Sequence, residues 1–224
     1  MNKKSIYFKL LAVLLCTTIL SSCDNKAALA DKTEVTGTTI MTSISDWVTY
    51  DANDYYTEWK NETPNYIKLN DTGATLEGTG ATVVDSKITI TTAGIYVISG
   101  KLNDGQIIVD IEDKGTVKLV LNGAEVNCSN SSPLYIKSAK KTIISLEAGT
   151  ENIISDGKKY VSTDDRNAAI FSQDDLTING TGNLTVRGNY NDGITSKDDL
   201  KITGGNITIY STDDGLVGKD LVAV

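Results

Sequence analysis

The chain contains the stretch Ile170-Phe171-Ser172-Gln173-Asp174-Asp175-Leu176-Thr177-Ile178, which returns 24 residues later as Ile194-Thr195-Ser196-Lys197-Asp198-Asp199-Leu200-Lys201-Ile202. After another 22 residues it begins a third time, as Leu216-Val217-Gly218-Lys219-Asp220-Leu221. A period of this length is typical of a solenoid, in which each repeat forms one coil and packs on the next.

Each repeat holds three short runs of alternating apolar residues, and turn signals such as Asn179-Gly180 and Asp214-Gly215 separate the runs. The pattern predicts an all-β fold, a parallel β-helix with three short strands per coil of 22–24 residues. In the first repeat we expect strands at about residues 168–171, 175–178 and 183–186, each stacked on its counterpart one period later.

Apolar runs begin near Tyr66 and recur every 7–11 residues, so we expect the β-helix to span residues 65–224. The early coils are less regular. Ser138 aligns with Ser172 if residues 156–167 form an inserted loop, and such loops commonly shape a binding face. Residues 41–64 contain Trp47, Tyr50, Tyr55, Tyr56 and Trp59, and we expect a short helix or an irregular N-terminal cap there.

Stacking brings the acidic residues of successive repeats together. Equivalent residues on neighbouring coils lie about 4.8 Å apart, so columns of carboxylates repel one another unless a cation neutralises them. Calcium is suited to this because it takes about six to eight oxygen ligands. The alternative is turn chemistry, since aspartate favours turns by itself. The predicted ligands are Asp174, Asp175, Asp192, Asp198, Asp199, Asp213, Asp214 and Asp220.

The N-terminus has the features of an export signal. Lysines flank the apolar core at residues 10–15, and Leu20-Ser21-Ser22-Cys23 is typical of a lipobox. We therefore expect residues 1–22 to be a signal peptide and Cys23 to carry the lipid, with residues 23–40 as a flexible tether. The predicted location is exported and membrane-anchored, at the cell surface or facing the periplasm.

Charge and composition exclude several classes of function. Loss of residues 1–22 removes three lysines and no acid, which changes the net charge from −8 to −11 and argues against nucleic acid as a partner. The chain has no histidine, which excludes Ser-His-Asp and Cys-His catalysis. Only Cys128 remains free after processing, so no intrachain disulfide is possible, and we expect it to be a small buried residue. We expect a monomer.

Carbohydrate contacts are expected from aromatic and basic side chains of the repeat region, because a flat ring offers an apolar face to a sugar. These candidates are Tyr190, Tyr210, Lys197, Lys219 and Arg187, with Tyr135 and Tyr160 nearby. Lys197 and Lys219 either neutralise the acidic column or act as the base of a calcium-assisted lyase. We predict no catalytic residue.

Several stretches resemble one known family. Gly94-Ile95-Tyr96-Val97-Ile98-Ser99-Gly100, Asn189-Tyr190-Asn191-Asp192-Gly193-Ile194 and Ser196-Lys197-Asp198-Asp199-Leu200-Lys201-Ile202 are similar to bacterial carbohydrate-binding, calcium-binding β-helix proteins, lipoproteins related in fold to pectate lyases. The resemblance implies a right-handed parallel β-helix with several calcium ions that binds plant-type or acidic polysaccharide such as polygalacturonate or cellulose. The acidic turn positions of the family correspond to Asp192, Asp198, Asp199, Asp214 and Asp220.

The predicted function is calcium-dependent binding of polysaccharide by a surface-anchored lipoprotein. The alternatives are a calcium-dependent pectate-type lyase and a structural adhesin or envelope protein whose calcium only stabilises the fold. The sequence stops within the apolar run Leu221-Val222-Ala223-Val224, and we expect further coils in a longer protein.

Overall fold

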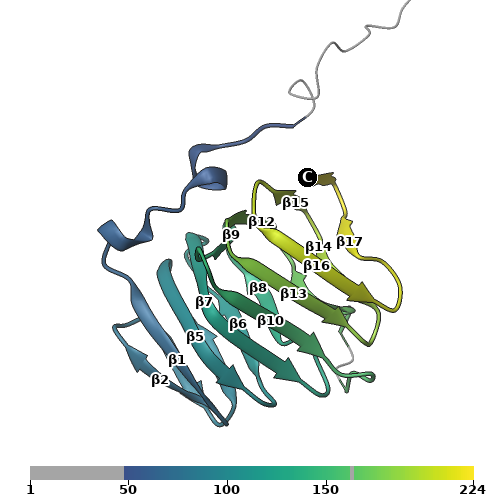
Figure 1. Ribbon diagram of the computed structural model, residues 1–224, viewed down its shortest axis with the longest axis horizontal. Helices are drawn as coiled ribbons and strands as arrows, with labels where there is room; N and C mark the ends of the chain where they lie inside the picture. Colours follow the sequence, from purple (N-terminus) through teal and green to yellow (C-terminus); the bar gives the residue numbers. More distant parts are fainter. Residues whose placement is uncertain (1–47, 162–163) are drawn as a thin grey trace, which may run out of the picture. The chain divides into compact units, whose positions relative to one another are not determined.

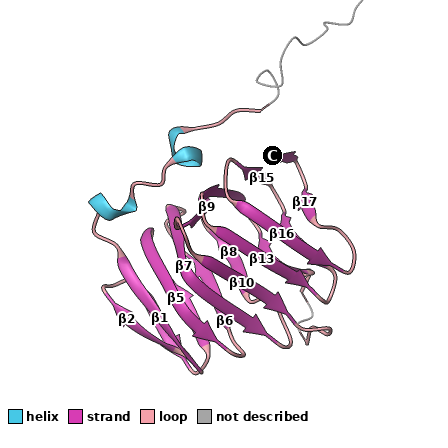
Figure 2. Ribbon diagram, viewed as in Figure 1, coloured by secondary structure: helices cyan, strands magenta, loops and turns pink. Residues whose placement is uncertain are grey.

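The computed structural model describes residues 48–161 and 164–224, and this part of the chain consists mainly of β-strands (Figure 1, Figure 2). The predicted all-β class is confirmed. The predicted signal peptide, the lipidated Cys23 and the tether lie outside the described residues. Among the described residues, no helix has the length and apolar character needed to cross a membrane.

Two 3-10 turns, η2 (Ala52–Tyr55) and η3 (Trp59–Asn61), precede the strands. The first strands are β1 (Asn65–Asp71), β2 (Ala74–Glu77), β3 (Ala81–Val84), β4 (Lys87–Ile90), β5 (Gly94–Leu102), β6 (Gln106–Asp110) and β7 (Thr116–Cys128). The next are β8 (Leu134–Ser138), β9 (Lys141–Leu146), β10 (Glu151–Asp156), β11 (Ala168–Ser172), β12 (Asp175–Gly180) and β13 (Asn183–Gly188). The last are β14 (Asp192–Ser196), β15 (Asp199–Ile202), β16 (Asn206–Ser211), β17 (Leu216–Gly218) and β18 (Leu221–Ala223).

The strands form one eleven-stranded sheet and one seven-stranded sheet. The smaller sheet has the order β17-β14-β11-β8-β6-β4-β3, and the larger has the path β16-β13-β10-β7-β9-β12-β15-β18. In the described part of the chain, β1 with β2 and β3 with β4 are antiparallel, and the other pairs are parallel. Strands far apart in sequence therefore lie side by side as successive rungs, as the colour gradient of Figure 1 shows.

The register follows the sequence repeat. Ile170 of β11 lies opposite Ile194 of β14, which lies opposite Leu216 of β17. These pairs have the offsets of 24 and 22 residues seen in the sequence, so the predicted parallel stacking of the repeats is confirmed. The earlier alignment was wrong. Ser172 lies opposite Ile136, and not opposite Ser138, because the corner from Ile136 to Lys141 is two residues longer than the corresponding corner from Ser172 to Asp175.

Strand β7 joins two stacks of strands into the larger sheet. Its first six residues pair with β9, and its residues 125–128 pair with β10. Gly123, with φ 75°, lies between these two halves. A left-handed backbone is strained for a residue with a Cβ atom, so glycine lets this strand change direction where later repeats use a turn between separate strands.

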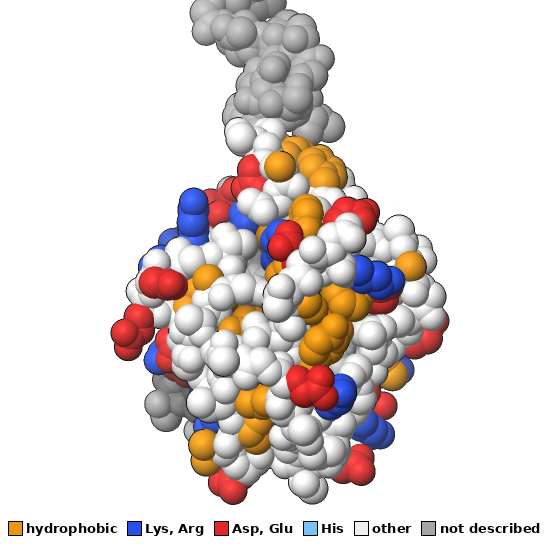
Figure 3. All heavy atoms as spheres, turned by 90° about the vertical axis from the view of Figure 1, so that its left-hand side faces the viewer, with side chains coloured by type: hydrophobic (Ala, Val, Ile, Leu, Met, Phe, Trp, Pro, Cys, Tyr) orange, Lys and Arg blue, Asp and Glu red, His pale blue; other side chains and the backbone are white. Residues whose placement is uncertain are grey.

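The core lies between the sheets and is made of columns of aliphatic side chains. Ile107, Leu134, Ile170 and Ile194 form one column of fully buried residues along the smaller sheet. Cys128 is also buried and unpaired, as predicted, and burial raises the pKa of its thiol. The N-terminal end of the core is covered by β2 and β3, whose apolar residues are partly buried against it. Figure 3 views this end, where apolar side chains appear among polar ones.

Residues 48–62, which we call the strap, cover the outer face of the strands β7, β9, β12 and β15. Asp54 is fully buried there, and its carboxylate accepts hydrogen bonds from Lys141 Nζ at 2.8 Å and from Thr177 Oγ1 at 2.7 Å. The Asp54 carbonyl accepts from Asn179 Nδ2 and Thr203 Oγ1. Tyr56 and Trp59 extend the contact toward Lys118 and Glu147. The described part of the expected cap segment is therefore held against the side of the strand stack.

Burial raises the pKa of Asp54, but the hydrogen bonds from Lys141 and Thr177 outweigh it and hold this pKa below its usual value. We expect Asp54→Asn to lower the free energy of unfolding by about 3 kcal/mol, because it leaves the buried Lys141 ammonium without its buried partner. Asp51→Asn is the matched control: Asp51 also pairs with Lys141 but is half exposed, so its loss should cost about 1 kcal/mol or less.

The measurement is urea unfolding of both variants between about pH 3 and pH 7. Because the folded pKa of Asp54 is depressed, its stabilisation is present above the unfolded pKa, near 4, and is lost as the pH falls through the folded pKa. The difference between wild type and Asp54→Asn should therefore shrink in acid. Equal effects of the two substitutions at pH 7 would contradict the assignment of Asp54 as the anchor.

Candidate functional site

The repeated aspartates lie at two corners of the strand stack, one at each end of β14. Asp192 is the first residue of β14. Asp198 lies two residues after its last residue, Ser196, and Asp199 begins β15. The parallel register brings the corresponding turns of the neighbouring repeats against both corners. The predicted acidic residues are thus brought together in two groups, and not in one continuous column.

The first group, which we call the Asp198 cluster, contains Asp175, Asp198 and Asp199. Each contributes a carboxylate oxygen to a set in which all atoms lie within 4.8 Å of one another. The three residues are half-buried. Asp220 of the next repeat adjoins them, since its backbone N–H approaches the Asp198 carbonyl at 3.4 Å. Oxygen atoms from three successive repeats therefore converge on this corner.

Electrostatic repulsion dominates the Asp198 cluster. Burial raises the pKa of Asp198, and the carboxylates of Asp175, Asp220 and Asp199 raise it further. Lys201 is the nearest compensating charge, with its mostly buried Nζ 3.1 Å from Asp199. One ammonium cannot balance four carboxylates. The geometry suits a divalent cation with oxygen ligands.

The second group contains Asp192, Asp213 and Asp214, and its chemistry differs. Asp192 is buried, and its carboxylate accepts hydrogen bonds from Asn167 Nδ2 at 2.6 Å and Thr195 Oγ1 at 3.1 Å. It also accepts from Asn191 Nδ2 at 2.9 Å and the Asp214 N–H at 3.3 Å. Four donors occupy the lone pairs of this carboxylate. An ion here would displace some of them, so the Asp198 cluster is the stronger candidate for a metal.

Asp174 belongs to neither group. Its carboxylate lies 3.1 Å from Lys114 Nζ and accepts the Ala139 N–H at 2.9 Å. Asp174 therefore ties its own repeat to the preceding one. The pairing of Asp174 with Asp198 in the sequence repeat did not reveal this difference, because Lys114 lies in an early loop that no repeat aligns.

The predicted sugar-contacting aromatic residues occupy two separate places. Tyr190 is 39% exposed, and its ring stacks on Tyr160 with the centroids 4.2 Å apart. Tyr160 is buried, and its hydroxyl donates to Asp156 at 2.7 Å, so it supports Tyr190 from below. Tyr210 is 56% exposed and lies opposite Arg187, whose guanidinium is 5.0 Å from the ring centroid.

The remaining candidates are less open. Tyr135 is half-buried, with Arg166 over its ring at 4.6 Å. Lys197 pairs with Asp165 at 3.4 Å and lies above the fully buried ring of Phe171. Lys219 follows β17 and forms no ion pair with another described residue. Residues 164–166, which belong to the predicted inserted loop 156–167, thus contact Tyr135 of β8, Gln173 after β11 and Lys197 after β14.

Sequence reasoning missed two residues that complete these sites, Asp156 and Lys201. Asp156 is buried and holds the segment of Tyr190 by accepting from the backbone N–H groups of Asn189 and Tyr190. Lys201 was detectable, because it lies two residues after Asp199 on the same face of a strand. Asp156 could not be identified from the sequence, because its hydrogen-bond partners come from an irregular loop and from the following repeat.

Comparison with known proteins gives the family. The profile of the family of carbohydrate-binding domain-containing proteins matches residues 84–224, so most of the folded part is covered. The chain belongs to this family. A carbohydrate-binding domain-containing protein of Acetivibrio thermocellus is 47% identical over 134 residues, which are 58% of this chain and 47% of that protein. The chain therefore matches about half the length of this relative.

A solved structure has a similar fold. The polysaccharide lyase-like protein from C. thermocellum, studied as a gadolinium derivative, matches with a TM-score of 0.67 and 42% sequence identity. The match covers 70% of this chain and 65% of that one. The predicted relation to carbohydrate-binding proteins is confirmed at the level of the family.

The repulsion within the Asp198 cluster has a measurable consequence. We expect Asp198→Asn to stabilise the protein in the presence of a chelator at pH 7, by about 0.5 kcal/mol, because it removes one of four crowded charges. The pKa of Asp198 is higher in the folded protein than in the unfolded chain. Its protonated form therefore stabilises the folded state at pH values below the unfolded pKa. This stabilisation is lost as the pH rises through the folded pKa and Asp198 becomes charged.

The gain from Asp198→Asn should therefore be full near pH 7 and should disappear toward pH 4. Thermal unfolding in chelator at several pH values measures it. Destabilisation at pH 7 in chelator would mean that hydrogen bonds to this carboxylate outweigh the repulsion.

Proposed function

We propose that this protein binds polysaccharide in a calcium-dependent manner as a surface-anchored lipoprotein. The observation that carries the proposal is the Asp198 cluster, in which carboxylates of successive repeats converge in a member of a carbohydrate-binding family. We propose further that the chain winds as a right-handed parallel β-helix with three strands per coil. The three parallel stacks β8-β11-β14-β17, β9-β12-β15-β18 and β10-β13-β16 support this architecture, and an experimentally determined structure tests it.

Calcium is the cation that best suits the Asp198 cluster. The described chain has no histidine and only a buried cysteine, so its available ligands are oxygen atoms, which hard cations prefer. Gadolinium is also a hard cation, and the similar lyase-like protein was studied as a gadolinium derivative. We assign Asp175, Asp198, Asp199 and Asp220 as the main ligands, and Asp213 and Asp214 as a weaker second site.

A bound calcium ion would also solve an electrostatic problem of recognition. After processing, the protein would carry a charge of −11, and an acidic polysaccharide such as polygalacturonate is also negative. The screening length at physiological salt is about 8 Å, too long to hide charges in contact. An ion with free coordination positions could accept uronate oxygens, while Tyr190, Tyr210, Arg187, Lys197 and Lys219 contact the sugar rings.

We expect the protein to be retained on polygalacturonate with calcium and released by a chelator. Asp199→Asn should weaken retention at least about tenfold, because it removes a charged carboxylate ligand of the calcium ion. The matched control is Asp174→Asn, since Asp174 lies outside both clusters and its loss should lower stability equally with and without calcium. Binding is measured by affinity pull-down, and folding by circular dichroism.

Thermal unfolding supplies a second measurement. Calcium at a hundredfold excess over its Kd should stabilise the wild type by about 2.7 kcal/mol, and Asp199→Asn less. Retention on polygalacturonate after calcium removal, with the fold unchanged, would disprove the calcium bridge. An ultraviolet signal of unsaturated uronide would favour the lyase alternative, which the lyase-like structural relative keeps open.

The anchor is tested separately from the binding activity. We expect Cys23 to carry diacylglycerol after removal of residues 1–22, because the lipobox ends at this cysteine. Mass spectrometry of the protein from the membrane fraction should show the added lipid, and Cys23→Ser should lose it. A wild-type protein released at a different bond without lipid would contradict the lipoprotein proposal.

A further inference from the structure

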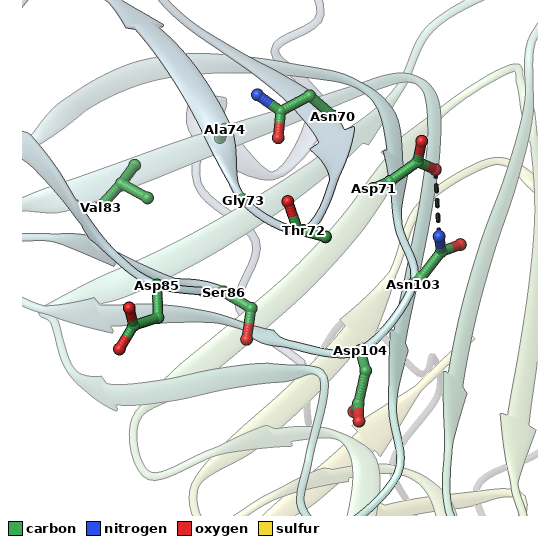
Figure 4. A pocket seen from close by; sticks show the side chains of 10 residues that line it. All are labelled: Asn70, Asp71, Thr72, Gly73, Ala74, Val83, Asp85, Ser86, Asn103 and Asp104. Carbon is green, nitrogen blue, oxygen red and sulfur yellow. Dashed lines mark hydrogen bonds between the residues drawn. The ribbon is translucent and has the colours of Figure 1, made fainter.

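A hollow lies at the opposite end of the strand stack from the Asp198 cluster, with a volume of about 640 Å³ (Figure 4). Three turns surround it: residues 70–73 at the end of β1 and in the turn to β2, residues 85–86 between β3 and β4, and residues 103–104 between β5 and β6. Figure 4 shows Val83 toward one end and the hydrogen-bonded pair Asp71 and Asn103 at the other. The hollow is open to solvent, and most of its lining side chains are exposed.

The polar groups of this hollow fall into two sets. Asp71 accepts from Asn103 Nδ2 at 3.1 Å, and Asp104 accepts from the N–H and the hydroxyl of Ser129 at 2.8 and 2.9 Å. These contacts fix the walls. The second set forms no side-chain hydrogen bond to another described residue and consists of Asn70, Thr72, Asp85 and Ser86. Two hydroxyls, a carboxamide and a carboxylate are therefore available to a ligand.

The charges of the lining select among ligand classes. Asp71, Asp85 and Asp104 line the hollow, and no lysine or arginine does, so an anionic sugar would be repelled. The three carboxylates do not converge on one point as those of the Asp198 cluster do, which argues against a single metal ion. A neutral polyhydroxylated ligand fits, because its hydroxyls can donate to Asp85 and both donate to and accept from Asn70, Thr72 and Ser86.

We propose that this hollow is a binding site for neutral saccharide that works without calcium. Six of its ten lining residues, 70–74 and Val83, precede the part of the chain that the family profile matches. The site is thus separate in position and in metal requirement from the acidic polysaccharide site proposed above. The protein would then hold a neutral glycan chain at one end of the stack and an acidic one at the other.

The test is NMR titration of the full chain, in the presence of a chelator, with the neutral oligosaccharide cellotetraose and separately with trigalacturonate. Cellotetraose should shift the amide signals of residues 70–74, 85–86 and 103–104, and trigalacturonate should not. The double variant Thr72→Val/Ser86→Ala removes two unpaired hydroxyls and should raise the Kd at least about tenfold. Asp85→Asn should weaken binding while keeping the left-handed backbone at φ 52°, which asparagine tolerates.

The matched control is Thr75→Val/Thr82→Val, which removes two exposed hydroxyls of β2 and β3 that do not line the hollow. It should leave the Kd unchanged. Absence of shifts at the hollow, shifts only near Tyr190 and Tyr210, or equal effects of both double variants would overturn the proposal. Because chelator is present throughout, failure of the calcium-dependent site would leave this result unaffected.

Discussion

Parallel register is the constraint on which the rest of this structure depends. Each residue of the repeat region lies beside its equivalent on the next rung, so any chemical property of one position is multiplied along a column. Apolar positions gain from this arrangement, because aliphatic side chains stack into a continuous core. Charged positions lose, because like charges are brought within a few ångströms of one another. The same register thus creates both the core and the Asp198 cluster.

The structure handles its stacked aspartates in three different ways. Asp174 is neutralised by Lys114 from an early loop, and Asp192 is buried under four hydrogen-bond donors. Asp198 has neither, and its neighbours are mostly other carboxylates. The difference explains why residues with the same place in a sequence repeat need not have the same function. A carboxylate is available to a ligand where no lysine and no set of hydrogen-bond donors from the protein already neutralises it.

The repeat predicted the all-β class, the strands of the late coils and their register to the residue. It could do so because residues one period apart in the sequence are neighbours in a stack of coils. The recurring apolar runs also indicated where the early strands lie, but the repeat did not predict how these strands are connected and paired. There, β5 and β7 run through the corner that later repeats form with a turn, and the antiparallel strands β2 and β3 have no counterpart. Ser138 was misaligned because the corner between β8 and β9 is two residues longer than the corner between β11 and β12.

The candidate sites were predictable to a similar degree. The aspartates of both clusters were found from their spacing, whereas Asp156 and Lys114 act through partners with no repeat relationship. The hollow near Asp85 could not be predicted, because it is assembled from three turns of different type. The exposure of each aromatic side chain could not be predicted from the sequence either, as the burial of Tyr160 beneath Tyr190 shows.

The strap changes how such a stack of repeats can come apart. In an array where each coil contacts only its neighbours, the terminal coil can fray while the rest stays folded. Asp54, however, is hydrogen-bonded to Thr177, 123 residues later, and to Thr203, 149 residues later. These contacts close a long loop, so they form only after the later strands are in place and add to the contact order of the chain. Loss of the last coils would release the strap as well, which makes the two ends of the stack unfold as one cooperative unit.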